Sequence, residues 1–260
     1  MTPPIYLQSF AALNSTGIIS PARTIRWDAD QQGPADVKRQ QVLGVPYPTF
    51  GKLSLADRLA FATSSLLLAH QPITNGTRTA LCAGVPYGSL GVDLAFVESL
   101  TGQFPSPAIF SATLPSSPLS EIAICYKIKG PNRVFCNANR SGIWALGYAG
   151  ELLYAGKAGD AIVLYVKCLE AADGARRFAN ATELGNCACY ALHFSTNRSL
   201  DNGLALPCRF SWQPGASTAH DESDELLFKE LFSAIVEQRS FNSTLDPYGL
   251  HGNLSIETGM

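Results

Sequence analysis

The hydrophobic residues of this chain follow two different periods. Apolar positions at helical spacing predict helices at 55–69, 92–100, 119–126, 141–154 and 223–239. Short apolar runs rich in β-formers predict strands at 5–10, 79–85, 133–136, 161–168, 188–194 and 209–212. Between residues 20 and 51 we expect loop with at most short structure, and after residue 241 a poorly ordered tail. Alternation of strands with helices predicts an α/β fold.

The most regular stretch lies between residues 133 and 168. A short extended run is followed by a turn, a helix in which Gly147 and Gly150 allow close approach, a second turn and an uninterrupted apolar strand. An unbroken apolar strand is typical of a sheet that is covered on both faces. The stretch therefore predicts a βαβ unit with parallel strands.

Composition adds a question about the surface. Hydrophobic residues make up 46% of the chain and charged residues 15%, with a net charge of 19 − 21 = −2. Globular chains carry roughly 25% charged residues. A near-neutral chain is not a generic binder of nucleic acid or anionic membrane, because both need a cationic surplus. The scarcity of charge fits either a surface covered by a partner or a large core under a Ser/Thr/Asn-rich surface.

Neither a targeting segment nor a membrane span is predicted. Residues 1–4 lack a basic region, and the longest apolar runs fall far short of the roughly 20 residues of a spanning helix. Seven cysteines, most of them within apolar runs, fit a reducing cytoplasm. Cys187, Cys189 and His193 are spaced for a strand within the core rather than for zinc, so we expect no metal and no cofactor.

The turn at 137–142 precedes a helix N-terminus. At such a turn α/β enzymes place an activated nucleophile, because the helix dipole and free amides stabilise an anion. Asn139 is not a nucleophile, and Ser141 fits a helix cap better than a nucleophile. We therefore predict no catalytic residue here. The nearby basic cluster could face an acidic partner or a phosphate, or be a solvated turn; it consists of Lys127, Lys129, Arg133 and Arg140.

A resemblance becomes specific over residues 130–160. This run resembles the active-site region of β-ketoacyl synthases, which belong to the thiolase-like superfamily, and residues 106–124 fit the segment that precedes it. The matching positions are Gly130, Pro131, Ala138, Ser141, Gly142, Ala145, Leu146, Leu153, Gly156 and Asp160. The resemblance covers 4–195 and is strongest over 106–168. Asn139 stands where that family has its catalytic cysteine, and the second half with the catalytic histidines has no counterpart.

The resemblance implies a fold and a domain division. The expected fold is a thiolase-like half, with a mixed, mainly parallel five-stranded sheet flanked by helices in a single domain. Residues 1–213 would form this ketosynthase N-terminal-like domain, and 214–260 a linker, an amphipathic helix and a tail.

The resemblance also implies a function. The chain is similar to half-length chain-length-factor subunits of the type II polyketide synthases that make aryl polyenes in Gram-negative bacteria. It would be a cytoplasmic pseudoenzyme that forms a heterodimer with a full-length ketosynthase and shapes the acyl tunnel during chain elongation. An acyl carrier protein would reach it only through the ketosynthase, and we expect neither nucleic acid nor a membrane span.

Two groups of residues would carry this role. The strand that pairs across the dimer in the family corresponds here to Arg133, Val134, Phe135, Cys136 and Asn137. Ile109 and Phe110 match the positions that gate the partner's acyl tunnel, and ordinary core packing is an equal alternative for them.

Two other functions stay open from the sequence. The chain could decarboxylate malonyl thioesters, as ketosynthase relatives without the cysteine can, with Asn139 orienting the thioester. It could also be a stand-alone acyl-binding module, which would need an apolar cavity and no partner interface.

Overall fold

The computed structural model describes residues 3–27, 33–34, 37–43, 46–101, 105–169, 186–198, 205–213, 224–237, 239–245 and 251–256. The strands are β1 (Ile5–Asn14), β2 (Gly17–Ser20), β3 (Arg23–Arg26), β4 (Thr79–Gly84), β5 (Asn132–Phe135), β6 (Asp160–Lys167), β7 (Ala188–Ser195), β8 (Leu206–Gln213), β9 (Phe241–Leu245) and β10 (His251–Ile256). The α-helices are α1 (Arg39–Val42), α2 (Leu55–His70), α3 (Leu90–Ser99), α4 (Pro107–Phe110), α5 (Ser117–Tyr126), α6 (Ser141–Tyr154) and α7 (Asp224–Val236). Each helix and strand predicted from the sequence is present, with ends shifted by a few residues.

The centre of the sheet has the predicted mixed arrangement. Five strands lie in the order β5-β4-β6-β7-β1. β4 pairs in parallel with β5 and β6, whereas β7 is antiparallel to both of its neighbours, β6 and β1. Four of these strands therefore point one way and β7 points the other. The βαβ unit is also confirmed, because α6 connects β5 to β6.

The sheet is larger than predicted. Ten of the described segments are strands of this sheet, because β8, β10 and β9 continue it beyond β1 and the β2–β3 hairpin pairs with the other end of β1. The predicted count of five strands is therefore too low, and the expectation of a poorly ordered tail after residue 241 is wrong. Phe241, Leu254 and Ile256 are buried. The domain boundary drawn after residue 213 coincides with the end of β8 and stays a prediction.

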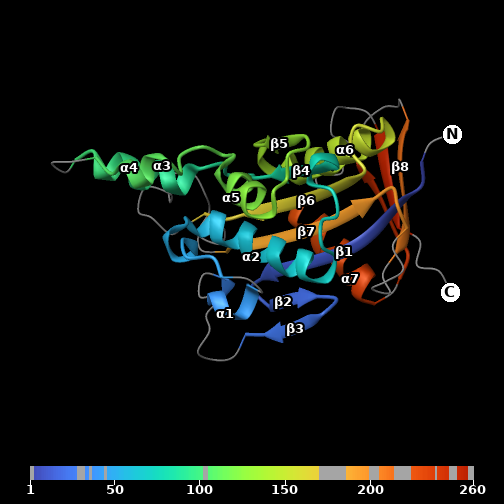
Figure 1. Ribbon diagram of the computed structural model, residues 1–260, viewed down its shortest axis with the longest axis horizontal. Coiled ribbons are helices and arrows are strands. Elements are labelled where there is room, and N and C mark those ends of the chain that lie inside the picture. The colour runs from blue at the N-terminus through green and yellow to red at the C-terminus, as the bar shows by residue number, and fades with distance from the viewer. Residues whose placement is uncertain are drawn as a thin grey trace.

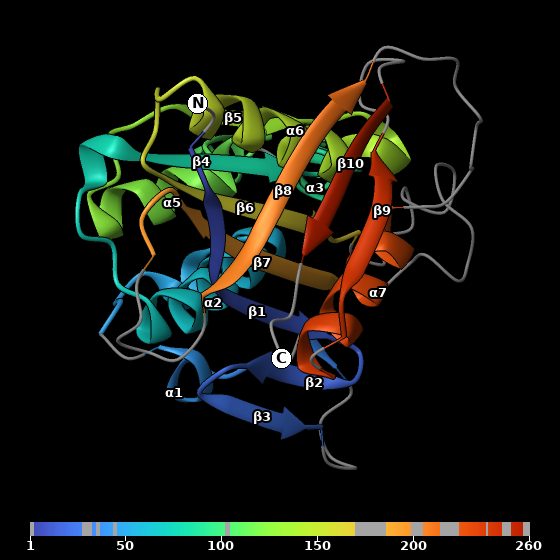
Figure 2. The same cartoon turned by 90° about the vertical axis from the view of Figure 1, so that its right-hand side faces the viewer.

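Each face of the central sheet is covered by its own core. Along β6, Val163 and Tyr165 join the core formed with α6, α7 and the C-terminal strands, while Ile162 and Leu164 join the core formed with α2 and α5. Alternate residues of a strand point to opposite faces, so burial on both faces requires the unbroken apolar run seen in the sequence. Figure 1 shows α2 and α5 on one face, and Figure 2 shows β8, β10 and β9 crossing steeply over the other.

Gly84 allows β4 to pass the first turn of α6. A Cβ atom at residue 84 would lie 2.3 Å from the carbonyl carbon of Ser141 and 2.4 Å from the amide nitrogen of Gly142. Both are backbone atoms, so neither can yield without moving β4 or α6. We expect Gly84→Ala to lower the free energy of unfolding by about 1–3 kcal/mol, measured by urea unfolding.

Gly51→Ala is the matched control for this substitution. A Cβ atom at residue 51 would meet nothing within 4 Å. We expect it to change the free energy of unfolding by less than about 0.5 kcal/mol. Equal stability of the two variants would contradict the close approach of β4 and α6.

Candidate functional site

The turn between β5 and α6 is held by its own hydrogen bonds. The Asn137 amide donates to Ser141 Oγ at 2.8 Å, and Ser141 Oγ donates to the Ala138 carbonyl at 2.9 Å. Ser141 is fully buried, and the N-cap residue of α6 is Arg140, which makes no side-chain cap. The predicted capping role of Ser141 is therefore wrong, because its hydroxyl closes the preceding 3-10 turn (Ala138–Arg140) instead.

The cap of α6 comes from far along the chain. Asp224, the first residue of α7, accepts a hydrogen bond from the Gly142 amide at 2.5 Å and from the Ile143 amide at 3.3 Å. Burial raises the pKa of this carboxyl to about 7, although the two amides and the Arg140 guanidinium lower it. The first backbone amides of α6, which at a helix N-terminus can bind an anion, thus donate to a carboxyl group of the same chain.

Gly142 lets α7 lie directly on α6. A Cβ atom at residue 142 would lie 2.6 Å from the Phe228 ring and 2.9 Å from the Tyr165 ring. These two rings stack with their centroids 5.0 Å apart. The match of Gly142 to the ketosynthase pattern therefore has a local packing reason in this chain.

Glu225 fixes the same end of α7. Its carboxylate lies 2.7 Å from Lys167 Nζ on β6 and 2.7 Å from Lys229 Nζ one turn along α7. Burial opposes ionisation of Glu225, but these two ammonium groups hold its pKa below the usual value. The adjacent carboxyls of Asp224 and Glu225 thus join α7 to both α6 and β6.

The sequence located the turn but not the residue that caps it. Asn139 lies in the 3-10 turn two residues before α6, as predicted, and its assignment as a vacated nucleophile position stays a prediction. Asp224 was missed because an acidic residue at the start of α7 is ordinary for a helix N-terminus. No local pattern indicates that it reaches a second helix 81 and 82 positions away.

Strand β5 is an edge of the sheet. It stands at the end of the strand order and pairs, among the described strands, with β4 alone. The carbonyls of Pro131 and Phe135 accept hydrogen bonds from Leu81 and Val85 of the β4 segment. In a parallel ladder, alternate residues turn their backbone groups to the same side. The backbone N–H and C=O of Val134 therefore point toward the open edge.

The strand predicted to lie at the interface is shorter in the structure than expected. β5 ends at Phe135, so Cys136 and Asn137 follow it and are exposed. The Arg133 guanidinium lies 5.1 Å from the centre of the Tyr148 ring, a cation–π contact. Phe135 packs against rings of α6.

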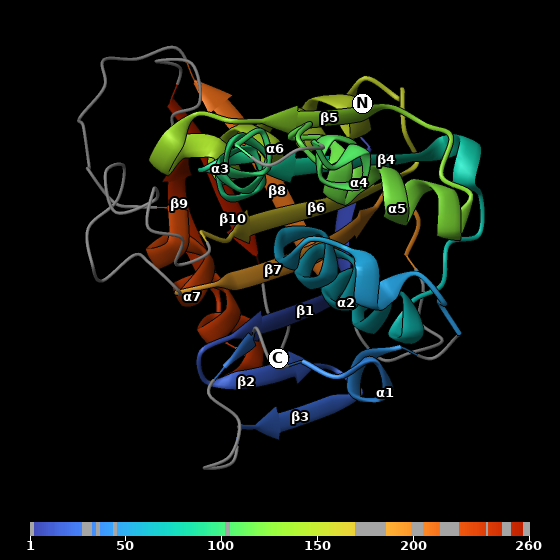
Figure 3. The same cartoon turned by 90° about the vertical axis from the view of Figure 1, so that its left-hand side faces the viewer.

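Helices α3 and α4 project from one end of the molecule, away from β8 (Figure 1), and are seen end-on in Figure 3. Neither helix has a buried residue. They touch through Phe96 and Phe110, whose ring centroids are 5.3 Å apart. Phe110 is 61% exposed and Val97 is 58% exposed. Core packing therefore does not account for Phe110, and Ile109 is half-buried on the same short helix.

The loop before α3 lies near the end of β5. Gly88 lies two residues before α3, and a Cβ atom there would be 3.7 Å from Cys136 Sγ just after β5. Val97, Leu100, Phe110 and Leu114 are all more than half exposed. We call these four residues, together with the open side of β5, the edge surface. It combines backbone groups that pair with no described strand and apolar side chains that are exposed in the described part of the chain.

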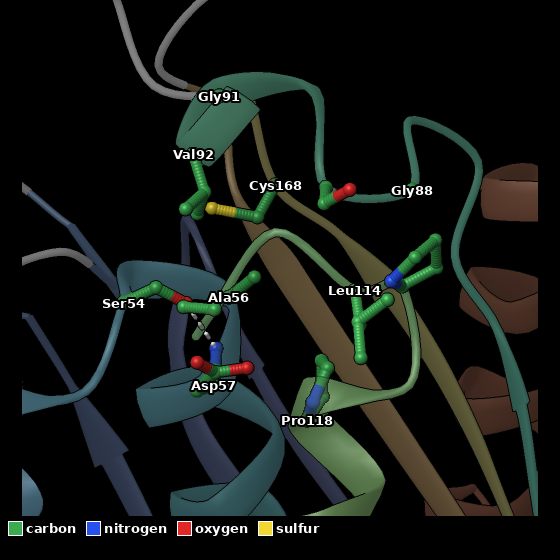
Figure 4. A pocket seen from close by; sticks show the side chains of 12 residues that line it. Ser54, Ala56, Asp57, Gly88, Gly91, Val92, Leu114, Pro118 and Cys168 are labelled. Carbon is green, nitrogen blue, oxygen red and sulfur yellow. Dashed lines mark hydrogen bonds between the residues drawn. The ribbon is translucent and has the colours of Figure 1, made fainter. Parts of the chain in front are cut away.

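A pocket opens where α2, α3 and the loop before α5 meet. It is a shallow recess open to solvent, and Figure 4 shows Val92, Leu114, Pro118 and Cys168 around it. The buried Asp57 carboxylate lies at its base and accepts a hydrogen bond from Ser117 Oγ at 3.1 Å. Burial raises the pKa of Asp57.

Two features are absent from the described residues. No helix among them is long and apolar enough to cross a membrane. In the same part of the chain, no three His, Cys, Asp or Glu side chains are grouped as metal ligands would be.

The carboxyl group of Asp224 predicts a particular pH dependence. A carboxyl whose pKa is raised from 3.8 to about 7 by folding keeps a proton that the unfolded chain releases. The free energy of unfolding should therefore fall as pH rises through this interval. Asp224→Asn cannot ionise, so we expect its urea-unfolding stability to lack this decline. If the free energies of unfolding of the wild-type chain and of Asp224→Asn changed with pH in the same way, the raised pKa of Asp224 would be contradicted.

Comparison with known proteins identifies the fold. No protein-family model and no curated protein matches the chain. Among solved structures, it is similar to a ketosynthase (ApeO) in complex with its chain length factor (ApeC) from Xenorhabdus doucetiae, with a TM-score of 0.64 and 16% identity. That match covers 98% of this chain and 99% of the other.

Two further solved structures are similar to this chain. The ishigamide ketosynthase/chain length factor gives a TM-score of 0.60 at 17% identity, covering 81% of this chain and 68% of the other. A β-ketoacyl synthase from Burkholderia phymatum STM815 gives a TM-score of 0.58 at 14% identity, and the match covers 91% of this chain and 70% of the other. The chain therefore has the thiolase-like fold of ketosynthases and chain length factors.

Proposed function

We propose that this chain is a non-catalytic, chain-length-factor-like subunit that pairs with a full-length ketosynthase and shapes its acyl tunnel. The shared fold supports this proposal, as does the match that extends over nearly the whole of both chains and comes from a ketosynthase–chain length factor complex. In such a complex the growing polyene or polyketide would be bound to an acyl carrier protein, which would dock on the ketosynthase.

The edge surface is the observation that carries the proposal. An unpaired edge strand is a ready template for another strand, and proteins normally cover or blunt it. Contiguous exposed apolar side chains mark interaction sites. In this chain the loop before α3 lies near the end of β5, and α3 and α4 present apolar side chains that no described part of the chain covers. A partner that adds its own strand to β5 and extends over α3 and α4 would cover both.

The α6 N-terminus supports a non-catalytic role. An acyl-transferring nucleophile needs a thiol or hydroxyl activated by a base or by a helix N-terminus. Asn139 offers an amide, and the Ser141 hydroxyl is buried and committed to the turn. The free amides of α6 already bind Asp224. A thiolate introduced beside this carboxyl would lack the positive field that lowers a thiol pKa.

Val134 allows the pairing of β5 to be tested without disturbing β4. Because its N–H points to the open edge, Val134→Pro removes a donor to a partner strand while the bonds to β4 remain. We expect Val134→Pro to reduce the yield of co-purified ketosynthase at least about tenfold, the loss of about 1.4 kcal/mol of binding free energy. Val134→Ala, which trims the side chain but keeps the N–H, is the control.

Two results would contradict the pairing. One is equal recovery of the ketosynthase with both Val134 variants. The other is a wild-type chain that stays monomeric and never co-purifies with a ketosynthase. Release of carbon dioxide from malonyl carrier protein by the isolated chain would instead favour the decarboxylase alternative.

Phe110 tests the shaping of the tunnel. If its exposed ring closes the partner's tunnel, Phe110→Ala opens space for a longer acyl chain. We expect the reconstituted complex to shift its product distribution toward longer chains, measured by mass spectrometry of the carrier-bound products. Val236→Ala, an exposed apolar residue on α7, is the control and should leave chain length unchanged. An unchanged distribution of product chain lengths with Phe110→Ala would contradict a role of Phe110 in closing the tunnel.

A further inference from the structure

Cys168 and Cys187 lie close together at the open end of two paired strands. Their Sγ atoms are 3.1 Å apart, about 1 Å more than the ~2.05 Å of a disulfide bond. β6 and β7 are antiparallel, and their last ladder pairs are Val166 with Cys189 and Lys167 with Ala188. The next step of this register brings Cys168 opposite Cys187.

Residues directly opposite in an antiparallel pair satisfy the backbone requirement for a disulfide. Their Cα atoms lie about 4.5–5.5 Å apart. A disulfide needs Cα atoms about 4.4–6.8 Å apart. The two cysteines could therefore be joined by rotation of their side chains, with little movement of either strand.

The two thiols differ in access. Cys168 is half-buried and lines the pocket between α2 and α3, where Figure 4 shows its sulfur directed toward Val92. Cys187 is 2% exposed. A reagent that approaches from the open side of the pocket would meet the half-buried Cys168 first, and Cys187 would then be the second thiol within reach.

The other five cysteines are poorly suited to the same chemistry. Burial raises the pKa of Cys82, Cys189 and Cys208 to about 12. Burial also raises the pKa of Cys125 and Cys136. Thiol–disulfide exchange needs a thiolate, so a raised pKa slows the attack of these five thiols on a disulfide. Cys187 is also buried, and what distinguishes it is a second thiol at 3.1 Å.

We propose that Cys168 and Cys187 form a reversible disulfide site at the wall of the pocket, oxidised by a low-molecular-weight disulfide such as oxidised glutathione. The Cys168 thiolate attacks one sulfur of the oxidant, whose S–S bond breaks and releases one glutathione thiolate, which takes up a proton. Cys187 then loses its proton and attacks the Cys168 sulfur, releasing the second glutathione. The two protein thiols lose two hydrogen atoms in total, and the oxidant is reduced to two thiols.

This site does not depend on the proposed function. It rests on the register of β6 and β7 and on the pocket. Oxidation would join the ends of β6 and β7 and fix Cys168 away from the pocket. In a reducing cytoplasm such a bond would be transient and would respond to the redox state.

Peptide mapping of the purified full chain tests the proposal. The chain is incubated with oxidised or reduced glutathione, alkylated, and digested with trypsin without reduction. We expect oxidised glutathione to link peptide 168–176 to peptide 178–198, and dithiothreitol to separate them. Because the second peptide contains both Cys187 and Cys189, fragmentation of the linked pair must place the bond at Cys187.

Variants provide the matched comparison. We expect Cys168→Ser and Cys187→Ser to abolish the link and Cys189→Ser to retain it. Glutathione attached to Cys168 without a link, a bond at Cys189, or full alkylation of both thiols in the oxidised wild-type chain would each overturn the proposal. The wild-type mapping decides the question even if a variant fails to fold.

Discussion

The rest of the structure depends on the contact between the Asp224 carboxyl and the first amides of α6. It joins the start of α7 to the central helix of the βαβ unit, 82 positions earlier in the chain. Only a glycine at position 142 permits this approach, because any side chain would overlap the rings of Phe228 and Tyr165. With α7 fixed there, Leu227, Leu231 and Ile235 complete the core that the C-terminal strands close.

The same contact sets the chemistry of the turn before α6. A helix N-terminus stabilises an anion, and enzymes use this property to activate a nucleophile. In this chain an internal carboxyl group accepts the hydrogen bonds of the first amides instead. One side of the βαβ unit is therefore completed within the chain. Its other side, at β5 and the projecting helices, keeps an open edge and exposed apolar side chains that fit the proposed partner.

Prediction from the sequence succeeded where burial imposes a periodic pattern. The apolar run of β6 and the helical spacing of α2 and α6 identify these elements because both faces of the central sheet are covered. Prediction failed for β9 and β10, because few of their residues are apolar. Such a strand has the sequence pattern of a polar tail. The edge position of β5 followed from the family resemblance. The exposure of Phe110 could not be predicted, because an apolar residue in a sequence does not show what covers it.

The sequence by itself determined the order of the elements, the βαβ unit, the absence of a thiol at position 139 and the shortage of charge. These follow from local spacing and residue chemistry. Only the tertiary structure decided that Asp224 caps α6, that the C-terminal strands extend the sheet, that Gly88 brings α3 beside the end of β5, and that Cys168 faces Cys187. Each of these contacts joins residues far apart in the chain, and its energy depends on geometry that no local pattern encodes. The shortage of charge is consistent with both explanations, since the described residues form two large cores and leave an apolar surface that none of them covers.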